Sequence, residues 1–238
     1  MNKKINVIVW GYTGHMGNIV CDLIKENSLF EYLGGVNKND YNVSLTNANV
    51  IIDFSSPSGT MQMLDTALEK KIPAVIATTG FNIEQEQIIK KASKSIPIFK
   101  SANMSFEVAL FKNILKSIAS KLENDSDIEI VETHHNRKVD NPSGTAKLLA
   151  EAINSGLKEQ KNIIYGRQGK RQKNEIGIAS LRGGNIVGEH TVKFFNDFET
   201  LEITHTAYSR EIFASGSLKA AEFIVKQNPG IYNMDDLF

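Results

Sequence analysis

The feature that most constrains this chain is a glycine-rich turn directly after an apolar segment near its start. Residues 5–10 read Ile-Asn-Val-Ile-Val-Trp, and Gly11, Gly14 and Gly17 follow at intervals of three. This pattern predicts a buried strand that ends in a tight turn and runs into a helix. Glycines let the backbone approach a ligand closely, and the amino end of a helix attracts anions. The turn therefore favours a pyrophosphate-binding loop, and a tight turn that binds nothing is the alternative.

The first half of the chain alternates short β-branched runs with longer amphipathic segments. Strands are expected at residues 5–10, 31–36, 50–54, 74–78 and 96–100, and helices at residues 16–26, 60–71 and 84–94. Such alternation is typical of βαβ units and predicts a parallel sheet with helices on both faces. Ligands of such a sheet bind beyond the carboxyl ends of its strands.

The pattern changes after residue 105. One long helix is expected at residues 106–122, followed by β-rich sequence with a single further helix at residues 142–157. Strands are expected at residues 127–133, 175–181, 188–195 and 200–207, a last helix at 215–225, and a short tail from 229. Strands with so few helices between them predict a second, α+β domain with a mixed sheet.

Composition excludes several classes of function. The 238 residues contain 27 Lys+Arg and 27 Asp+Glu, so no overall basic field attracts nucleic acid. The lone Cys21 cannot form an intramolecular disulfide, which fits a reducing compartment. No apolar run approaches the ~18 residues of a membrane span, and residues 5–10 are too few for a signal-peptide core. We therefore expect a cytoplasmic protein without nucleic-acid or membrane partners.

The end of the second expected strand bears on cofactor choice. An acidic residue at this position binds the ribose hydroxyls of NAD and repels a 2′-phosphate. Here Asn37 and Lys38 take the place, so an adenosine 2′-phosphate would meet a cation. This favours NADPH over NADH. The alternative is that Lys38 is a solvated loop charge and Asp40 binds the ribose.

Two later strand ends fall at the same edge of the expected sheet. They are rich in small and hydroxyl-bearing residues, at Thr78-Thr79-Gly80 and at Ser101-Ala102-Asn103-Met104. Such residues can line a nicotinamide cleft with their backbone amides and carbonyls. Each segment taken singly fits a plain strand-to-helix loop better than a cofactor site.

The densest polar cluster, residues 132–146, lies between an expected strand and an expected helix. Asn141 can cap the helix, and Pro142 suits the first helical position. This leaves unpaired the N–H groups of Ser143, Gly144 and Thr145, which would form a small anion site. Lys138 adds a cation, and His134 and His135 add proton donors that work near neutral pH.

Three less specific interpretations of this cluster remain open. The histidines could be structural hydrogen-bonding residues, the helix start could merely be capped, or the cluster could bind a metal. Metal binding is the weakest of these, because adjacent residues on a strand point to opposite faces. His190 and His205 could complete such a site only if the fold brings them there, and no metal is predicted.

On these residues the chain resembles the dihydrodipicolinate reductases, also called 4-hydroxy-tetrahydrodipicolinate reductases. His-His-x-x-Lys-x-Asp-x-Pro-Ser-Gly-Thr-Ala, which begins at His134, is far more specific to that family than the glycine turn. Further matching stretches span nearly the whole chain in order, at residues 11–17, 53–55, 77–81, 101–105, 182–190, 203–205 and 213–221.

The resemblance implies a fold, an assembly and a reaction. Residues 1–105 and 211–238 would form a Rossmann-like dinucleotide-binding domain, and residues 106–210 a domain for substrate binding and tetramerisation. The implied reaction is the NAD(P)H-dependent reduction of 4-hydroxy-tetrahydrodipicolinate, a dicarboxylate, to tetrahydrodipicolinate with loss of water, in diaminopimelate and lysine biosynthesis. The implied assembly is a homotetramer.

The resemblance also implies residue roles. His134 corresponds to the proton donor and acceptor, Lys138 to a second proton donor, and His135, Ser143, Gly144 and Thr145 to the substrate site. The cofactor contacts would be Gly11, Tyr12, Thr13, Gly14, His15, Met16, Ala77, Thr78, Thr79, Ser101, Ala102, Asn103 and Met104, and Lys38 joins them on the argument from its charge. Asn141 replaces a common Ala, and the acidic ribose ligand of some members is absent.

Two other functions are compatible with part of this pattern. A dinucleotide-binding sensor without turnover would keep the fold, but the presence of both His134 and Lys138 argues against it. A homoserine or aspartate dehydrogenase would share the first domain, but would not need Lys138 beside an anion-binding helix start.

Overall fold

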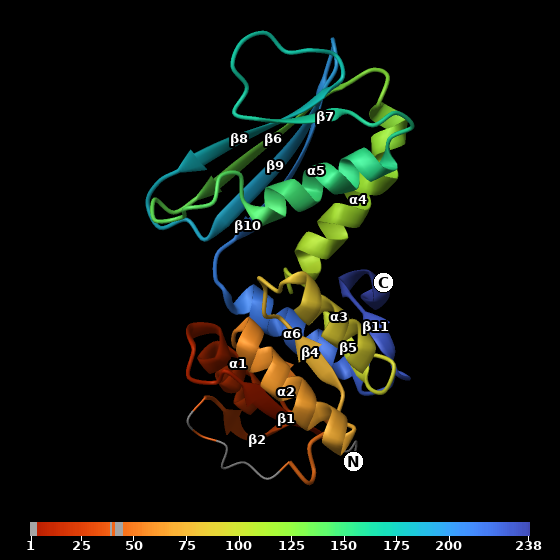
Figure 1. The fold of residues 1–238 in the computed structure, drawn as a ribbon. Helices are drawn as coiled ribbons and strands as arrows, with labels where there is room; N and C mark the ends of the chain where they lie inside the picture. The colour runs from red at the N-terminus through yellow and green to blue at the C-terminus, as the bar shows by residue number, and fades with distance from the viewer. Residues whose placement is uncertain (1–3, 39, 41–44) are drawn as a thin grey trace. The chain divides into compact units, whose positions relative to one another are not determined.

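The computed structural model describes residues 4–38, 40 and 45–238. The chain forms two compact units, Met1–Phe106 with Glu211–Phe238, and Glu107–Arg210. Each unit is built on one sheet, as Figure 1 shows. No helix in the described ranges is long and apolar enough to cross a bilayer.

The sheet of the first unit has six strands in the order β11-β5-β4-β3-β1-β2. They are β1 (Ile5–Trp10), β2 (Phe30–Val36), β3 (Val50–Asp53), β4 (Ala74–Ile76), β5 (Pro97–Lys100) and β11 (Gly230–Tyr232). Every neighbouring pair is parallel. The carboxyl ends of β1 and β3–β5 therefore lie at one edge of the sheet. The tail expected from residue 229 is in fact an edge strand, because β11 pairs with β5.

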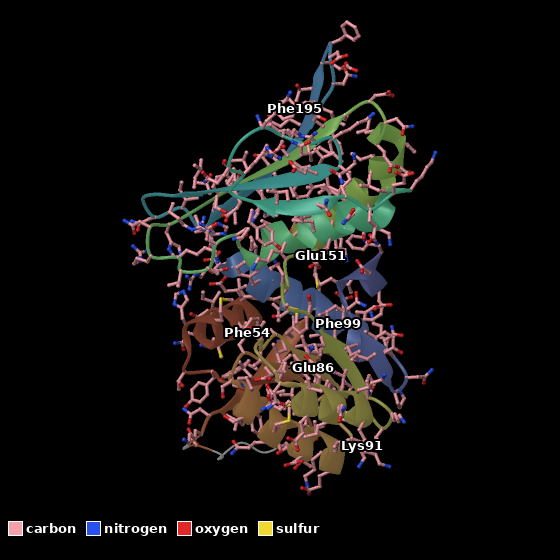
Figure 2. All side chains as sticks on the ribbon, turned by 45° about the horizontal axis from the view of Figure 1, so that its top comes forward. Phe54, Glu86, Lys91, Phe99, Glu151 and Phe195 are labelled. Atoms are coloured by element: carbon pink, nitrogen blue, oxygen red, sulfur yellow. The ribbon has the colours of Figure 1, made fainter. Side chains whose placement is uncertain are left out.

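Helices cover both faces of this parallel sheet. They are α1 (His15–Glu26), α2 (Pro57–Lys70), α3 (Ile83–Ala92) and α6 (Glu211–Ile224), followed by a short 3-10 helix, Met234–Leu237. α1 packs against α6, and α2 against α3 (Figure 1). Ile98 belongs to the buried cluster under α2 and α3, whereas Phe99 packs edge-on against Phe223 of α6 (Figure 2). Successive residues of β5 thus face opposite layers, which confirms the expected Rossmann-like unit.

The second unit has a mixed five-stranded sheet in the order β10-β9-β6-β8-β7. Its strands are β6 (Asp127–His134), β7 (Asn162–Tyr165), β8 (Glu175–Arg182), β9 (Gly188–Phe195) and β10 (Thr200–Ala207), and its helices are α4 (Phe106–Leu122) and α5 (Gly144–Gly156). β6 runs parallel to β8 and antiparallel to β9. This confirms the expected mixed sheet, although β7 was not expected.

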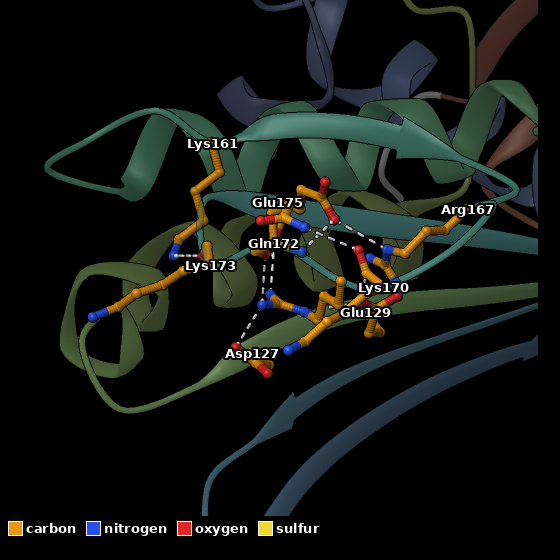
Figure 3. Close-up of polar contacts among 9 residues, drawn as sticks. Asp127, Glu129, Lys161, Arg167, Lys170, Gln172, Lys173 and Glu175 are labelled. Carbon is orange, nitrogen blue, oxygen red and sulfur yellow. Dashed lines mark hydrogen bonds and ion pairs between the residues drawn. The ribbon is translucent and has the colours of Figure 1, made fainter.

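The two faces of this sheet differ in character. The inner face packs on α4 and α5 and includes Ile128 and Ile130 of β6, with Glu132 and His134 next on the same side. The opposite, outer face carries the alternate residues, and no described helix covers it. Part of it lies under residues 166–174, because Arg167 reaches Glu129 at 2.6 Å and Glu175 at 3.0 Å (Figure 3).

Candidate functional site

The glycine turn after β1 is shaped so that two of its positions require glycine. Gly11 has φ +82°, and a Cβ there would lie 2.8 Å from the carbonyl oxygen of Phe54. A Cβ on Gly17 would lie 2.2 Å from the carbonyl oxygen of Gly11. The backbone of the turn is therefore drawn close to both β3 and α1, as a phosphate-binding loop requires.

The start of α1 suits an anion. Gly14 is its N-cap residue and provides no side chain to accept a hydrogen bond from the first turn. That turn also contains no acidic residue. The amino-terminal N–H groups and the helix dipole are therefore not offset by a local carboxylate.

A pocket of about 280 Å³ lies beside this turn. Its lining residues are Trp10, Gly11, Thr13, Gly14, Asn37, Lys38, Phe54, Ser55, Ser56, Ser58, Gly59 and Gln62. The structure thus places Lys38 beside the glycine turn. The serines after β3 were missed, because Ser55 and Ser56 resemble an ordinary helix start, and Ser56 does cap α2. Their place at the shared carboxyl edge of the sheet was the available signal.

Asp40 is engaged by a neighbour in the same region. The Tyr12 hydroxyl donates to the Asp40 carboxylate at 3.1 Å, and its ring covers Gly35, where a Cβ would lie 2.2 Å from the ring. The Asn37 amide donates to Thr13 at 3.3 Å. Lys38 and Asp40 therefore have different surroundings. Lys38 lines the pocket, whereas the Asp40 carboxylate is hydrogen-bonded to Tyr12.

The other expected cofactor residues lie at the same sheet edge but outside the pocket lining. Thr78 is buried and donates to Asp53 at 3.1 Å, so its hydroxyl is used within the unit. Met104 is also buried, whereas Thr79 and Ala102 are exposed. Ser101 donates to the Asn103 carbonyl at 2.6 Å, which folds that loop tightly. The remaining three differ in burial: Ala77 and Met16 are partly buried and His15 is exposed.

In the second unit, His134 ends β6 and is held by a buried carboxylate. Its Nδ1 atom lies 2.5 Å from Oε2 of the fully buried Glu132. Arg182, opposite on β8, donates to both Glu132 oxygens at 2.9 and 2.8 Å. Burial raises the pKa of Glu132, but hydrogen bonds from His134 and Arg182 outweigh that effect and leave the pKa well below its usual range.

The predicted start of the following helix was wrong by two residues. α5 begins at Gly144, and its cap is Ser143, whose hydroxyl accepts the Ala146 N–H at 3.1 Å, so neither Asn141 nor Pro142 has the predicted role. The Ser143 N–H is not unpaired either, because it donates to Glu132 at 3.1 Å. The Ser143 side chain caps the helix, and the Ser143 backbone is held by Glu132 of β6. These two contacts set the start of α5 in place of the proline.

Lys138 and His135 lie in the loop between β6 and α5. Lys138 Nζ forms an ion pair with Asp140 at 2.8 Å and is partly buried. That contact is the main cause of the lowered pKa of Asp140. His135 donates its backbone N–H to Ile186 at 2.8 Å, and burial is the main cause of its lowered pKa.

His190 was not assigned a role, yet it belongs to this cluster. Its ring centre lies 5.1 Å from that of His134, and its Nε2 atom lies 3.0 Å from the Ser143 hydroxyl. Burial lowers the pKa of His190 to about 3, so the ring is neutral. His205 pairs with His190 across β9 and β10. Among the described residues, no three His, Cys, Asp or Glu side chains form a metal-binding group.

Comparison with known proteins covers both units. Residues 5–104 match the family described as "Dihydrodipicolinate reductase, N-terminus", and residues 107–238 match "Dihydrodipicolinate reductase, C-terminus". A 4-hydroxy-tetrahydrodipicolinate reductase of Alkaliphilus oremlandii is 45% identical over 98% of both chains. One from Clostridium tetani is 46% identical over 97% of this chain and 96% of its own.

Solved structures give the same fold. A dipicolinate-bound dihydrodipicolinate reductase from Paenisporosarcina sp. TG-14 superimposes with a TM-score of 0.82 over 99% of this chain and 100% of its own, at 20% identity. A myo-inositol dehydrogenase from Corynebacterium glutamicum gives 0.61 over 99% and 92%, at 14% identity.

Proposed function

The chain belongs to the dihydrodipicolinate reductase family, and from this premise we propose that His134 and Lys138 handle the protons of its reaction. That reaction is the NAD(P)H-dependent reduction of 4-hydroxy-tetrahydrodipicolinate to tetrahydrodipicolinate with loss of water, in diaminopimelate and lysine biosynthesis. The observation that supports the two roles most is that His134 ends β6, Lys138 lies in the loop that follows, and this loop leads into the start of α5 within the same unit.

The first unit fits a nicotinamide dinucleotide. The turn from Gly11 to Gly17 forms a backbone cradle that a Cβ would fill, and the start of α1 favours a phosphate there. When bound, the cofactor supplies a hydride from C4 of its nicotinamide ring. We assign the cofactor contacts to residues 11–16, 77–79 and 101–104, and add Ser55 and Ser56 because they line the pocket.

Lys38 supports a preference for NADPH within this site. A 2′-phosphate carries nearly two negative charges, and an ammonium group in the same pocket would form a charge-assisted hydrogen bond with it. The Asp40 carboxylate would repel the phosphate, but this carboxylate already accepts a hydrogen bond from the Tyr12 hydroxyl. NADH lacks this phosphate and gains nothing from Lys38.

The substrate is a dicarboxylate, so its site needs cations and N–H donors. We assign the substrate contacts to Lys138 and His135 in the loop and to Ser143, Gly144 and Thr145 at the start of α5, where the Ser143 N–H is itself held by Glu132. Hydride arrival leaves an electron pair on the substrate ring that must take up a proton. His134 can deliver one from its ring at neutral pH, and Lys138 can deliver a second or hold a carboxylate.

A coupled assay tests these roles. The substrate is generated in situ from pyruvate and aspartate semialdehyde, and the oxidation of NADPH and NADH is followed separately. We expect His134→Ala and Lys138→Ala each to lower kcat by about 100-fold or more. The Kd for NADPH, measured by fluorescence titration, should change less than about threefold, because both residues lie outside the nucleotide unit. Wild-type kcat in either variant contradicts the role of that residue, and equal loss of NADPH affinity contradicts the division of labour.

The assembly and cellular location are also part of the proposal. The outer face of the second sheet carries Leu181 and Phe195, which are 54% and 40% exposed (Figure 2 labels Phe195), and no described helix covers it. An uncovered sheet face of this kind favours association with further copies of the chain. We propose that the protein is a homotetramer assembled through its second unit and acts in the cytoplasm.

A further inference from the structure

The inner face of β6 carries a carboxylate to which the proposed reaction gives no task. Glu132 makes four polar contacts. Its Oε2 atom lies 2.5 Å from His134 Nδ1 and accepts from Arg182, and its Oε1 atom accepts from Arg182 and from the Ser143 N–H. One fully buried side chain therefore joins the proposed proton donor to the cap residue of α5.

These contacts determine which nitrogen of His134 carries a proton in the neutral ring. The two-pronged contact with Arg182 favours the ionised form of Glu132, and an ionised carboxylate can only accept hydrogen bonds. Nδ1 must therefore donate, which leaves Nε2 as the nitrogen that exchanges protons. Gly188 lies beside Nε2, and a side chain there would crowd this nitrogen, because a Cβ would be 3.0 Å away.

The cations near His134 are each paired with a carboxylate. Arg182 is paired with Glu132 and Lys138 with Asp140, so neither acts as an unpaired cation against the ring. His190 is neutral at 5.1 Å. The titratable groups that face the ring are Glu132 on β6, Arg182 on β8, His190 on β9, and His135, Lys138 and Asp140 in the loop before α5.

We propose that Glu132 is a positioning residue, which holds Nδ1–H of His134 so that Nε2 faces the substrate. The inference rests on the proposed role of His134. In the step, the Nε2–H bond breaks and a C–H bond forms on the substrate. The electron pair of the Nε2–H bond stays on Nε2, and the electron pair that hydride addition leaves on the substrate forms the C–H bond. The other proton stays on Nδ1, hydrogen-bonded to Glu132, and a proton from solvent later returns to Nε2.

The variant Glu132→Gln tests this directly. An amide can donate to Nδ1 and so favour the wrong tautomer. We expect kcat to fall about 100-fold or more, with KM for the substrate and Kd for NADPH within about threefold of wild type. An unchanged kcat, or an increase in KM as large as the loss of kcat, would overturn the proposal.

Glu129→Gln is the matched control. Glu129 lies on the same strand and also binds arginines, but on the outer face, away from His134. We expect this variant to keep wild-type kcat even where its unfolding free energy falls as much as that of Glu132→Gln. Equal losses of kcat in both variants would mean a structural role and overturn the proposal.

A double variant separates this inference from the proposed function. In a His134→Ala background, Glu132→Gln should lower kcat by less than about threefold, because positioning requires the residue that is positioned. Multiplicative losses would overturn the inference alone. Wild-type kcat in His134→Ala itself would overturn the proposed function first.

The tautomer can be measured without a variant. Nitrogen-15 NMR of histidine-labelled wild-type protein, assigned through His134→Gln, should show Nδ1 protonated and Nε2 unprotonated in neutral His134. Predominant protonation of Nε2 would overturn the proposal even if Glu132→Gln fails to fold.

Discussion

At the scale of single residues, cofactor choice depends on Lys38. We expect Lys38→Glu to lower kcat/KM for NADPH about tenfold or more relative to NADH, because a carboxylate in the pocket repels the 2′-phosphate. The ratio of the two kcat/KM values measures this. Lys94→Glu, on a surface lysine outside the pocket lining, should leave the ratio unchanged. An unchanged ratio in Lys38→Glu would show that the lysine is a solvated loop charge.

His190 gives a pH dependence of stability. Its pKa is about 6.5 in the unfolded chain and about 3 when buried, so below pH 6.5 the unfolded state binds the extra proton. The contribution of neutral His190 to the unfolding free energy is therefore complete above pH 6.5. It is lost as pH falls toward 3, by up to about 1.4 kcal/mol per pH unit. We expect His190→Gln to have a shallower slope than wild type in urea unfolding between pH 4 and 6.5 at fixed protein concentration. Identical slopes would contradict the burial of a neutral ring.

At the scale of elements, the segment 166–174 is held on the outer face by ion pairs. Arg167 reaches Glu129 and Glu175, and Gly177 leaves room for them, because a Cβ there would lie 2.0 Å from Glu129 (Figure 3). We expect Arg167→Ala to lower the unfolding free energy by about 1–2 kcal/mol, between the values for exposed and buried pairs. Cleavage by trypsin at Lys170 and Lys173 should accelerate.

The matched control for this loop is an exposed pair. Lys4 and Glu31 are each about half exposed and lie 3.0 Å apart, so Lys4→Ala should cost less than about 0.5 kcal/mol. An Arg167→Ala variant with wild-type stability and cleavage rate would show that these ion pairs do not hold the segment.

Elements with a strong period were predictable from sequence, and those set by distant contacts were not. The alternation of short β-branched runs, such as those around Ile8 and Ile98, with amphipathic segments predicted buried parallel strands, and the structure has them. Strand β11 was missed because its three residues owe their extended form to pairing with β5. The start of α5 was misplaced because Glu132, eleven residues earlier, takes the N–H of Ser143. Sequence alone did not reveal that contact.

The candidate sites divide in the same way. The turn around Gly11 could be predicted because its chemistry is local, with glycines required by close backbone approach. The role of Glu132 could have been suspected from its period-two relation to His134 on one strand. Arg182 and His190 could not, because only the register of β8 and β9 against β6 brings them to His134.

At the scale of the whole molecule, the proposed homotetramer would assemble through the outer face of the second sheet. A homotetramer of four 26.4 kDa chains would elute near 106 kDa in size exclusion with light scattering. Thr204 lies exposed on β10 and its hydroxyl is 3.0 Å from that of Thr191, so a larger charged side chain at 204 would project from this face. We expect Thr204→Arg to shift the mass toward dimers or monomers while the circular dichroism spectrum stays native, because an unpaired charge is costly in a buried interface.

The control for assembly is a charge change of the same kind in the other unit. Thr66→Arg, on the exposed side of α2, adds the same group far along the chain from the second sheet and should leave the mass unchanged. Loss of mass in both variants would point to general destabilisation. An unchanged mass in Thr204→Arg would exclude this part of the outer face from the interface, and a wild-type mass of 26.4 kDa would contradict the homotetramer itself.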